Sequence, residues 1–243
     1  MTKFFLFGKT DKGLHRKNNE DTILINEDTG FCLVADGIGG AAAGEIASNI
    51  FAMTAEKVFS KRKNNYDKIS ELVQQTFQIA NDSILNYADR NPKYKGMGCT
   101  AELLALTATR FVLGHMGDSR TYRLRNGSLK RLTSDHSLVQ DQLDHGMITE
   151  DEVAHHSFKN VILRAVGIKK NPELDILKGK IVPGDLFLLC SDGLTDMIND
   201  SLVKQYLSSG TDIKEKVDNL IHAANANGGK DNISVVLADI PQA

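Results

Sequence analysis

The segment from Phe31 to Ile50, FCLVADGIGGAAAGEIASNI, joins an apolar run, one carboxylate and a cluster of glycines. The apolar residues up to Ala35 predict a buried strand, and a helical pattern begins near Gly44. Asp36 stands at the end of this strand. The glycines that follow let the backbone take positive φ values and let another group approach the main chain, so the Gly37 carbonyl is free to face a ligand. Taken alone, the pattern favours an ordinary glycine-rich turn over a metal site.

The composition is typical of a globular protein that buries a sizeable core, with 243 residues of which 41% are hydrophobic and 25% are charged. The formal net charge is -2 and the basic run KRK at 61–63 is short, so nucleic acid is not an expected partner. The N-terminal apolar run is too short for a signal peptide, and no segment has the length and hydrophobicity of a bilayer span. We therefore expect a cytoplasmic protein that does not bind membranes. Cys32, Cys99 and Cys190 lie in apolar runs and are expected to be buried, reduced thiols.

The predicted elements follow the order strands, two helices, strands, two helices and a final strand. Apolar residues from Ile69 to Ile84 recur at steps of three and four and predict a helix with one stripe against a core. Asn126 and Gly127, between two alternating segments, predict a tight β-hairpin. Strands joined by hairpins, together with paired helices, indicate stacked antiparallel sheets flanked by helices. This is an α+β fold and not a doubly wound parallel sheet.

We expect a single domain over residues 1–243, with a flap subdomain inserted at about 133–166. The flap segment is polar and rich in His and Asp. A capping box at Thr149 and Glu152 opens a short helix within it. Because polar loops on a rigid scaffold often carry binding functions, we expect the flap to gate a site or to select substrates.

Six acidic residues stand at the ends of strand-like runs, several of them beside Gly or Asn. Each one alone is best explained as a turn former, because Asp and Gly favour turns for local reasons. Together they offer the oxygen ligands that Mg2+ or Mn2+ prefers, and carboxylates from different strand ends can converge on one ion. Arg16 adds a cation beside the first pair. The six residues are Glu20, Asp21, Asp36, Asp118, Asp192 and Asp231.

Five motifs follow one another along the chain: RKNNED at 16–21, VADGIGG at 34–40, GDSR at 117–120, SDGLTD at 191–196 and GGKDNISVV at 228–236. These motifs and their order resemble those of the metal-dependent protein phosphatases of type 2C, in particular the compact bacterial members. The resemblance covers nearly the whole chain, including LTSDHSLVQ and NVILRAVG around the flap. It implies a four-layer α-β-β-α sandwich of two antiparallel sheets with helices outside.

The resemblance also implies a core site with two ions, each Mn2+ or Mg2+. Asp36 would bridge both ions, and Asp192 and Asp231 would complete the first. Glu20 and the Gly37 carbonyl would serve the second. Two such ions lower the pKa of a shared water, which then attacks phosphorus in line without a phosphoenzyme intermediate.

By the same resemblance, Asp21 would hold waters of the second ion and Asp118 would bind a third, weaker ion. Arg16 would bind the substrate phosphate through its planar guanidinium. Two positions depart from the family pattern. Ile38 stands where eukaryotic relatives have a histidine proposed as a proton donor, which leaves the general acid unassigned. Ala41 stands where many bacterial members have histidine, and we expect this to have a modest effect on turnover or metal affinity.

The implied activity is hydrolysis of phosphoserine and phosphothreonine in proteins, in signalling, by a monomer that opposes a Ser/Thr kinase. The expected partners are phosphorylated proteins and a cognate kinase. Two alternatives stay open at this point. One is a pseudophosphatase that binds phosphoproteins without hydrolysing them, against which the presence of Asp36, Asp192 and Asp231 argues. The other is a two-metal hydrolase of small molecules or nucleic acid, against which the near-neutral charge and the motifs argue.

Overall fold

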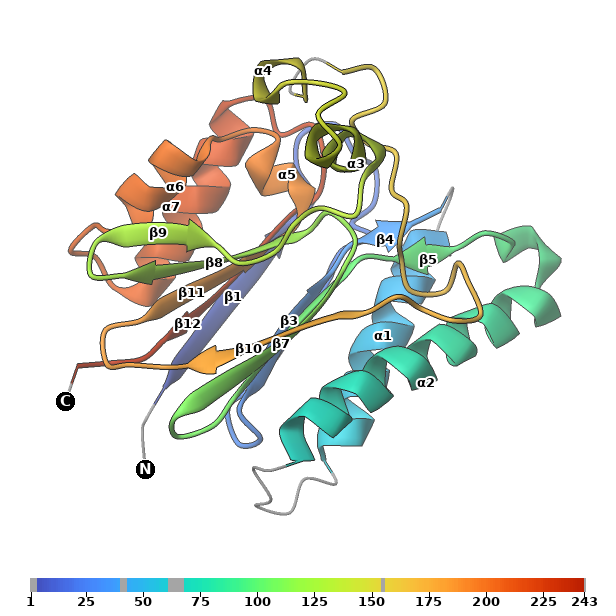
Figure 1. The fold of residues 1–243 in the computed structure, drawn as a ribbon, viewed down its shortest axis with the longest axis horizontal. Coiled ribbons are helices and arrows are strands. Elements are labelled where there is room, and N and C mark those ends of the chain that lie inside the picture. The colour runs from blue at the N-terminus through green and yellow to red at the C-terminus, as the bar shows by residue number, and fades with distance from the viewer. Residues whose placement is uncertain (1–3, 40–42, 61–67, 154–155, 243) are drawn as a thin grey trace.

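The computed structural model describes residues 4–39, 43–60, 68–153 and 156–242. Gly40 and Ala41, the basic run at 61–63 and residues 154–155 of the predicted flap lie outside these ranges. Within the described residues, two five-stranded antiparallel sheets face each other, and helices cover both outer faces (Figure 1). The predicted α+β sandwich with four layers is therefore confirmed.

The strands of the first sheet are, in order, β1 (Phe5–Asp11), β12 (Ile233–Asp239), β11 (Leu186–Cys190), β8 (Arg120–Arg125) and β9 (Ser128–Arg131). The first and last strands of the described chain are thus neighbours and pair along their full length. The predicted hairpin joins β8 to β9. Asn126 and Gly127 at its turn have φ values of 51° and 71°, as a two-residue turn that matches the strand twist requires.

The strands of the second sheet are, in order, β10 (Asp175–Lys180), β7 (Arg110–Met116), β6 (Ala101–Leu106), β3 (Phe31–Ala35) and β2 (Thr22–Asn26). Every residue of β3 is buried, because both faces of this strand are covered. Leu33 packs under the helices on one side, whereas Cys32 and Val34 pack against the first sheet on the other. The unbroken apolar run seen in the sequence follows from this two-sided burial.

Helices form the two outer layers. The second sheet is covered by α1 (Ala43–Phe59) and α2 (Ile69–Arg90), which is followed by a short 3-10 helix, η2 (Pro92–Tyr94) (Figure 1). The first sheet is covered by α5 (Asp192–Thr195), α6 (Asp200–Leu207) and α7 (Ile213–Ala226). Two helices were predicted before the final strand, and α5 is an additional one-turn helix. Only Ser191 separates it from β11, and four residues are too few to show a helical period.

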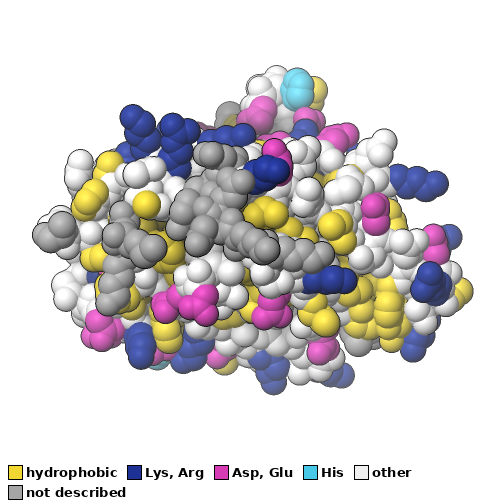
Figure 2. All heavy atoms as spheres, turned by 90° about the horizontal axis from the view of Figure 1, so that it is seen from below, with side chains coloured by type: hydrophobic (Ala, Val, Ile, Leu, Met, Phe, Trp, Pro, Cys, Tyr) yellow, Lys and Arg dark blue, Asp and Glu magenta, His cyan; other side chains and the backbone are white. Residues whose placement is uncertain are grey.

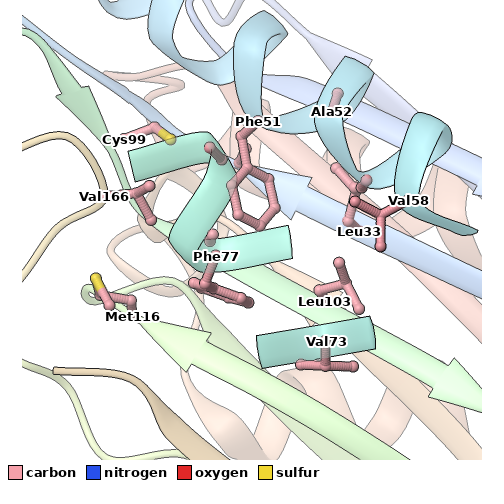
Figure 3. Packing of buried hydrophobic residues seen from close by; sticks show 14 of the residues in the cluster. Leu33, Phe51, Ala52, Val58, Val73, Phe77, Cys99, Leu103, Met116 and Val166 are labelled. Atoms are coloured by element: carbon pink, nitrogen blue, oxygen red, sulfur yellow. The ribbon is translucent and has the colours of Figure 1, made fainter. Parts of the chain in front are cut away.

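The core between α1, α2 and the second sheet is built from large apolar side chains (Figure 3). Phe51 of α1 and Phe77 of α2 meet edge to face, with ring centroids 4.9 Å apart. Beside Phe77, Val73 of the same helix and Leu103 of β6 fill the space above the sheet (Figure 3). The three cysteines are free and buried, as predicted. This packing holds the ends of the strands rigidly in place.

The predicted flap contains α3 (Leu138–Asp144) and α4 (Glu150–Val153), which lie at the end of the sandwich away from both termini (Figure 1). The Thr149 N–H donates to the Glu152 carboxylate over 2.8 Å, as the capping box predicts. Helix α3 was not predicted. Its one buried residue is Val139, so it carries no apolar stripe from which a helical period could be recognised.

The turn predicted at Gly37 is wrong in detail. Residues 37 and 38 form the short strand β4 (Gly37–Ile38), which pairs with β5 (Gly98–Cys99). A two-residue strand is too short to show an alternating pattern in the sequence. It is recognised only from its pairing with β5, about sixty residues further along the chain.

The surface seen from below carries basic and acidic side chains interspersed among apolar ones (Figure 2). This mixture agrees with the formal net charge of -2. None of the helices in the described part of the chain combines the length and apolar character that crossing a bilayer needs.

Phe77 provides a test of the core. Replacing this fully buried ring with alanine leaves a cavity beneath α2, and we expect Phe77→Ala to lower the free energy of unfolding by about 3–5 kcal/mol. Ile79→Ala, on the same helix but 47% exposed, is the matched control and should change it by less than about 0.5 kcal/mol. Urea unfolding followed by circular dichroism measures both variants. Equal losses in the two would contradict the packing described here.

Candidate active site

The predicted carboxylates lie at one end of the two sheets because neighbouring strands are antiparallel. Ala35 at the end of β3 lies opposite Thr22 at the start of β2. In the other sheet, Cys190 at the end of β11 lies opposite Val235 of β12. The acidic residues flank these positions: Glu20 and Asp21 precede β2, Asp36 follows β3, Asp118 follows β7, Asp192 follows β11 and Asp231 precedes β12.

Asp21 fastens the two sheets together at this end. Its Oδ2 atom accepts hydrogen bonds from the Ser191 hydroxyl over 2.9 Å and from the Ser234 hydroxyl over 2.6 Å. Both serines belong to the first sheet and its connections, whereas Asp21 leads into the second. Since all three residues are buried, these bonds set the relative position of the sheets where the site is built.

The carboxylates are close enough to change one another's ionisation. The pKa of Asp36 lies well above its ordinary value because the carboxyl is buried and because four neighbouring carboxylates repel its charge. Burial, followed by the charges of Asp118 and Asp231, raises the pKa of Asp192 in the same way. Burial also raises the pKa of Asp21 to about 6 and that of Asp118 to about 7. The ionised form of each of these four carboxyl groups is therefore destabilised in the folded chain.

Three oxygens of the cluster have no hydrogen-bond partner among the described residues: Asp21 Oδ1, Asp118 Oδ1 and Asp192 Oδ1. A buried carboxylate oxygen without a partner costs free energy. A hard divalent cation such as Mg2+ or Mn2+ supplies that partner, because it prefers carboxylate oxygens. The donor set fits such an ion. In the described part of the chain, however, no three acidic, His or Cys side chains already surround a common point, so the donors are adjacent without forming a coordination sphere.

Glu20 and the Gly37 carbonyl come together over Gly44, near the start of α1. A Cβ atom at Gly44 would lie 2.4 Å from Glu20 Oε2 and 2.6 Å from the Gly37 oxygen. Only glycine leaves room for both oxygens. The Glu20 N–H donates to Asn232 Oδ1 over 2.8 Å, which fixes the backbone from which the carboxylate projects. The structure thus brings together the two predicted donors of the second ion.

Arg16 lies at the rim, in the loop between β1 and β2. Its Nη2 donates to Asp231 Oδ2 over 2.5 Å, and its side chain is 49% exposed. Asn232 shapes this loop, because its side-chain amide donates to the carbonyls of Lys12 and Asn18, each over 2.9 Å. The sequence indicated Asn232 only as a turn residue next to Asp231. In the structure Asn232 is almost completely buried under this loop, and its side chain makes three hydrogen bonds to the loop backbone, at Lys12, Asn18 and Glu20.

Thr100 connects Asp36 to the turn that carries Asp118, a role with no signal in the sequence. Its N–H donates to the Asp36 carbonyl over 2.8 Å, and its hydroxyl accepts from the Asp36 N–H over 3.1 Å. The same hydroxyl lies 2.7 Å from the Ser119 hydroxyl. A buried threonine between two strands, β5 and β6, is not distinguishable from core packing until the fold shows its neighbours.

A cavity of about 280 Å3 opens between this cluster and the flap. Asp118 and Asp192 line one side of it. Ser137 and Val153 from the flap line the other, together with Lys159. The predicted third-ion residue therefore faces the flap.

Two predicted departures from the family pattern have different outcomes. Ile38 lies half-buried in β4 and offers no transferable proton. Ala41 lies outside the described residues, so the effect expected from it stays a prediction.

Replacing one carboxylate with its neutral amide distinguishes two effects on stability: repulsion among the carboxylates, seen in chelator, and cation binding, seen with Mn2+. We expect Asp192→Asn to unfold at the same or a higher temperature than the wild type in chelator, because one buried negative charge is gone. Saturating Mn2+ should stabilise the wild type by about 4 kcal/mol at a thousandfold excess over its Kd, and the variant by less than half as much. Differential scanning calorimetry measures both. Asp218→Asn, at an exposed pair with Lys9, is the control. A full Mn2+ shift in Asp192→Asn would contradict the assignment.

Comparison with known proteins gives one consistent family. Residues 15–238 match the family described as protein phosphatase 2C. The chain is 35% identical over 236 residues to the serine/threonine phosphatase stp of Listeria innocua, covering 95% of this chain and 94% of that protein.

Solved structures agree with this match. The crystal structure of the Mycobacterium tuberculosis serine/threonine phosphatase PstP superposes with a TM-score of 0.92 at 32% identity, covering 98% of this chain and 99% of that one. The catalytic domain of PstP in complex with two manganese ions superposes with a TM-score of 0.90 at 31% identity over the same shares. Sequence, fold and site agree: the chain belongs to the protein phosphatase 2C family.

Proposed function

We propose that this chain is a metal-dependent protein serine/threonine phosphatase, a hydrolase that removes phosphate from phosphoserine and phosphothreonine. The observation that carries this proposal is the buried carboxylate cluster where the two sheets meet, with three unpartnered oxygens and a half-exposed arginine at its rim. Such a cluster suits a site that holds cations and a phosphate group together. The relatives described above are themselves named as serine/threonine phosphatases.

The proposed cofactor is a pair of Mn2+ or Mg2+ ions. Asp36, Asp192 and Asp231 would hold one ion. Glu20 and the Gly37 carbonyl would hold the other, with Asp36 shared between them. When bound, such ions lower the pKa of a coordinated water and neutralise charge on the phosphate. Support for this pair comes from PstP, which was solved with two manganese ions.

Asp21 orients water in this proposal. Its Oδ2 atom is held by the hydroxyls of Ser191 and Ser234, so its direction is fixed. Its Oδ1 atom has no partner among the described residues and is available to accept a hydrogen bond from a water. The hydroxyl contacts therefore let one carboxylate join the sheets and orient a water at the same time. Asp118, on the flap side, would serve a third and weaker ion.

Arg16 binds the substrate phosphate in this proposal. The contact with Asp231 keeps its guanidinium over the cluster, and its exposure leaves the other donors open to solvent. A planar guanidinium can donate two parallel hydrogen bonds to phosphate oxygens and thereby hold the phosphorus in one orientation. It also stabilises the negative charge that develops as the phosphate ester breaks.

We further propose that residues 1–243 form one catalytic domain, with the flap at 133–166 inserted in it. The site draws its residues from both sheets, which supports a single unit. The protein would act in the cytoplasm as a monomer, on proteins phosphorylated by a Ser/Thr kinase that it opposes. Neither nucleic acid nor a membrane is part of the proposal.

Phosphate release from a phosphothreonine peptide tests the function. We expect activity with Mn2+, none with chelator, and little activity on nucleotides. Arg16→Ala should lower kcat/KM by about 10- to 100-fold, because a charge-assisted contact to phosphate is lost. Lys17→Ala, at the exposed neighbouring position, should leave kcat/KM within about twofold, as surface changes usually do. A wild type that binds the phosphopeptide but never hydrolyses it would indicate a binding module instead.

The flap is attached to the site edge by an ion pair between Lys159 Nζ and Asp196 Oδ2, 2.6 Å apart. If the flap selects substrates, Lys159→Met should change KM for phosphopeptides by up to about fivefold, since a partly exposed pair contributes at most about 1 kcal/mol. KM for a small aryl phosphate should stay the same, because such a substrate does not extend to the flap. Lys9→Met breaks a similar exposed pair, made to Asp218 of α7 and not to the flap, and is the control. Unchanged phosphopeptide preference would refute the selection role.

A further inference from the structure

His136 stands at the N-terminal side of the flap and makes two hydrogen bonds to a single residue of the site. Its N–H donates to the Gly117 carbonyl over 2.8 Å. Its Nδ1 atom accepts from the Gly117 N–H over 3.2 Å. His136 is buried, and Gly117 directly precedes Asp118. The backbone and the side chain of one residue therefore hold both polar groups of the residue before a proposed ligand.

These two bonds hold the backbone from which Asp118 projects. The Gly117 N–H belongs to the peptide plane before Gly117, and the Gly117 carbonyl belongs to the plane that contains the Asp118 nitrogen. Because both planes are held, the Asp118 nitrogen and Cα, from which the side chain starts, are held in place as well. Gly117 has a φ of 114°, and a Cβ there would lie 2.5 Å from Thr100, so the turn has no room to relax in that direction.

The ring of His136 has one protonation pattern that satisfies its contacts. Since Nδ1 accepts from Gly117, the proton lies on Nε2, which donates to Asp175 Oδ2 over 3.2 Å. Arg164 lies beside both groups, 3.5 Å from Asp175 Oδ1 and 3.4 Å from Nε2. The ring of His136 also packs against the ring of His115, and the two ring centroids are 4.5 Å apart. Burial and the nearby His115 lower the pKa of His136 to about 4, which keeps Nδ1 free as an acceptor at neutral pH.

The same residue also attaches the far end of the flap. The Leu163 N–H donates to the His136 carbonyl over 2.7 Å. A further β-bridge pairs Ser137 with Ile162. Two flap segments that are more than twenty residues apart in sequence therefore meet at His136. A displacement of the flap at His136 would therefore also displace the turn that carries Asp118.

We infer that His136 is a positioning residue that sets the orientation of Asp118 and joins it to the flap, so that ion binding at Asp118 depends on the Nδ1 contact to Gly117. The inference rests on the proposed function in that Asp118 would hold an ion. It concerns binding and not the chemical step, because the hydrogen bonds of the His136 side chain go to Gly117, Asp175 and Arg164 and to none of the core carboxylates.

Two substitutions separate the positioning role from a packing role. His136→Asn places an acceptor where Nδ1 stands and keeps the Gly117 contact. His136→Gln moves its polar group one bond further out, toward Asp175, and loses the Gly117 contact. The two side chains have the same functional group and differ by one methylene, so they are a matched pair.

The test is isothermal titration calorimetry of the full chain with Mn2+ alone. Asp118→Asn is the reference for loss of the weakest ion. We expect His136→Gln to weaken that ion by about 10- to 100-fold, the usual effect of removing a partner that orients a ligand. The tighter ions should keep their affinities. His136→Asn should bind Mn2+ as the wild type does. Hydrogen exchange of residues 133–166, measured by mass spectrometry, should increase in His136→Gln and not in His136→Asn.

Wild-type Mn2+ binding by His136→Gln would overturn the inference, and so would an equal loss in both variants. If His136→Gln does not fold, Asp175→Ala replaces it, because Asp175 is half-exposed and its loss frees the ring without touching Gly117. We then expect the weakest ion to be bound severalfold less tightly, and unchanged binding would overturn the inference. The phosphopeptide assay stays separate: a chain that binds Mn2+ in this pattern without hydrolysing phosphopeptide refutes the proposed function and leaves the role of His136 intact.

Discussion

Mutual repulsion among buried carboxylates is the constraint on which the rest of this structure depends. Asp36 and Asp192 are buried beside further acidic groups, and their raised pKa values record the cost of that arrangement. Such a cluster persists only if its members are held by groups that cannot move away. The four-layer sandwich supplies this rigidity, because strand ends anchored in packed cores cannot separate without opening a sheet. Asp21 is an example, because its bonds to Ser234 of the opposite sheet and to Ser191 directly after β11 make a charged group part of the link between the sheets.

The backbone around the cluster is shaped by the space that its oxygens need. Gly44 is glycine because Glu20 and the Gly37 carbonyl occupy the place of a side chain. Gly117 has a positive φ and lies against Thr100, where a side chain would collide. Glycine thus stands at the two positions where backbone or carboxylate atoms come closest to the chain. A side chain at either glycine would collide with these atoms.

On the flap side, the site is attached by contacts of two kinds. The bonds between His136 and Gly117 are buried and directed at the backbone, so solvent does not compete with them. The pair between Lys159 and Asp196 is partly exposed and is weakened by water and salt. The buried contacts thus lie at the turn that carries Asp118, and the partly exposed ion pair lies at the edge of the cavity.

Local features of the sequence predicted the parts of this protein that local physics controls. The apolar run of β3 and the hairpin at Asn126 and Gly127 have the predicted bounds and turn geometry. Helix α3 and the strand pair β4 and β5 were missed, because α3 has a single buried residue and a two-residue strand has no period. The predicted acidic residues lie at the expected strand ends. The contacts of Asn232 and Thr100 have no signal in the sequence, because their partners lie far away in the chain.

The sequence by itself determined which residues carry oxygen donors and which segments become strands, since both depend on residue type and on neighbours a few positions away. Only the tertiary structure decided which donors meet. Arg16 lies 215 residues from Asp231, and Asp21 lies 213 residues from Ser234. Contacts over such separations follow from the order and register of the strands in two packed sheets. That order is set by how the whole core is filled, so no local pattern records it.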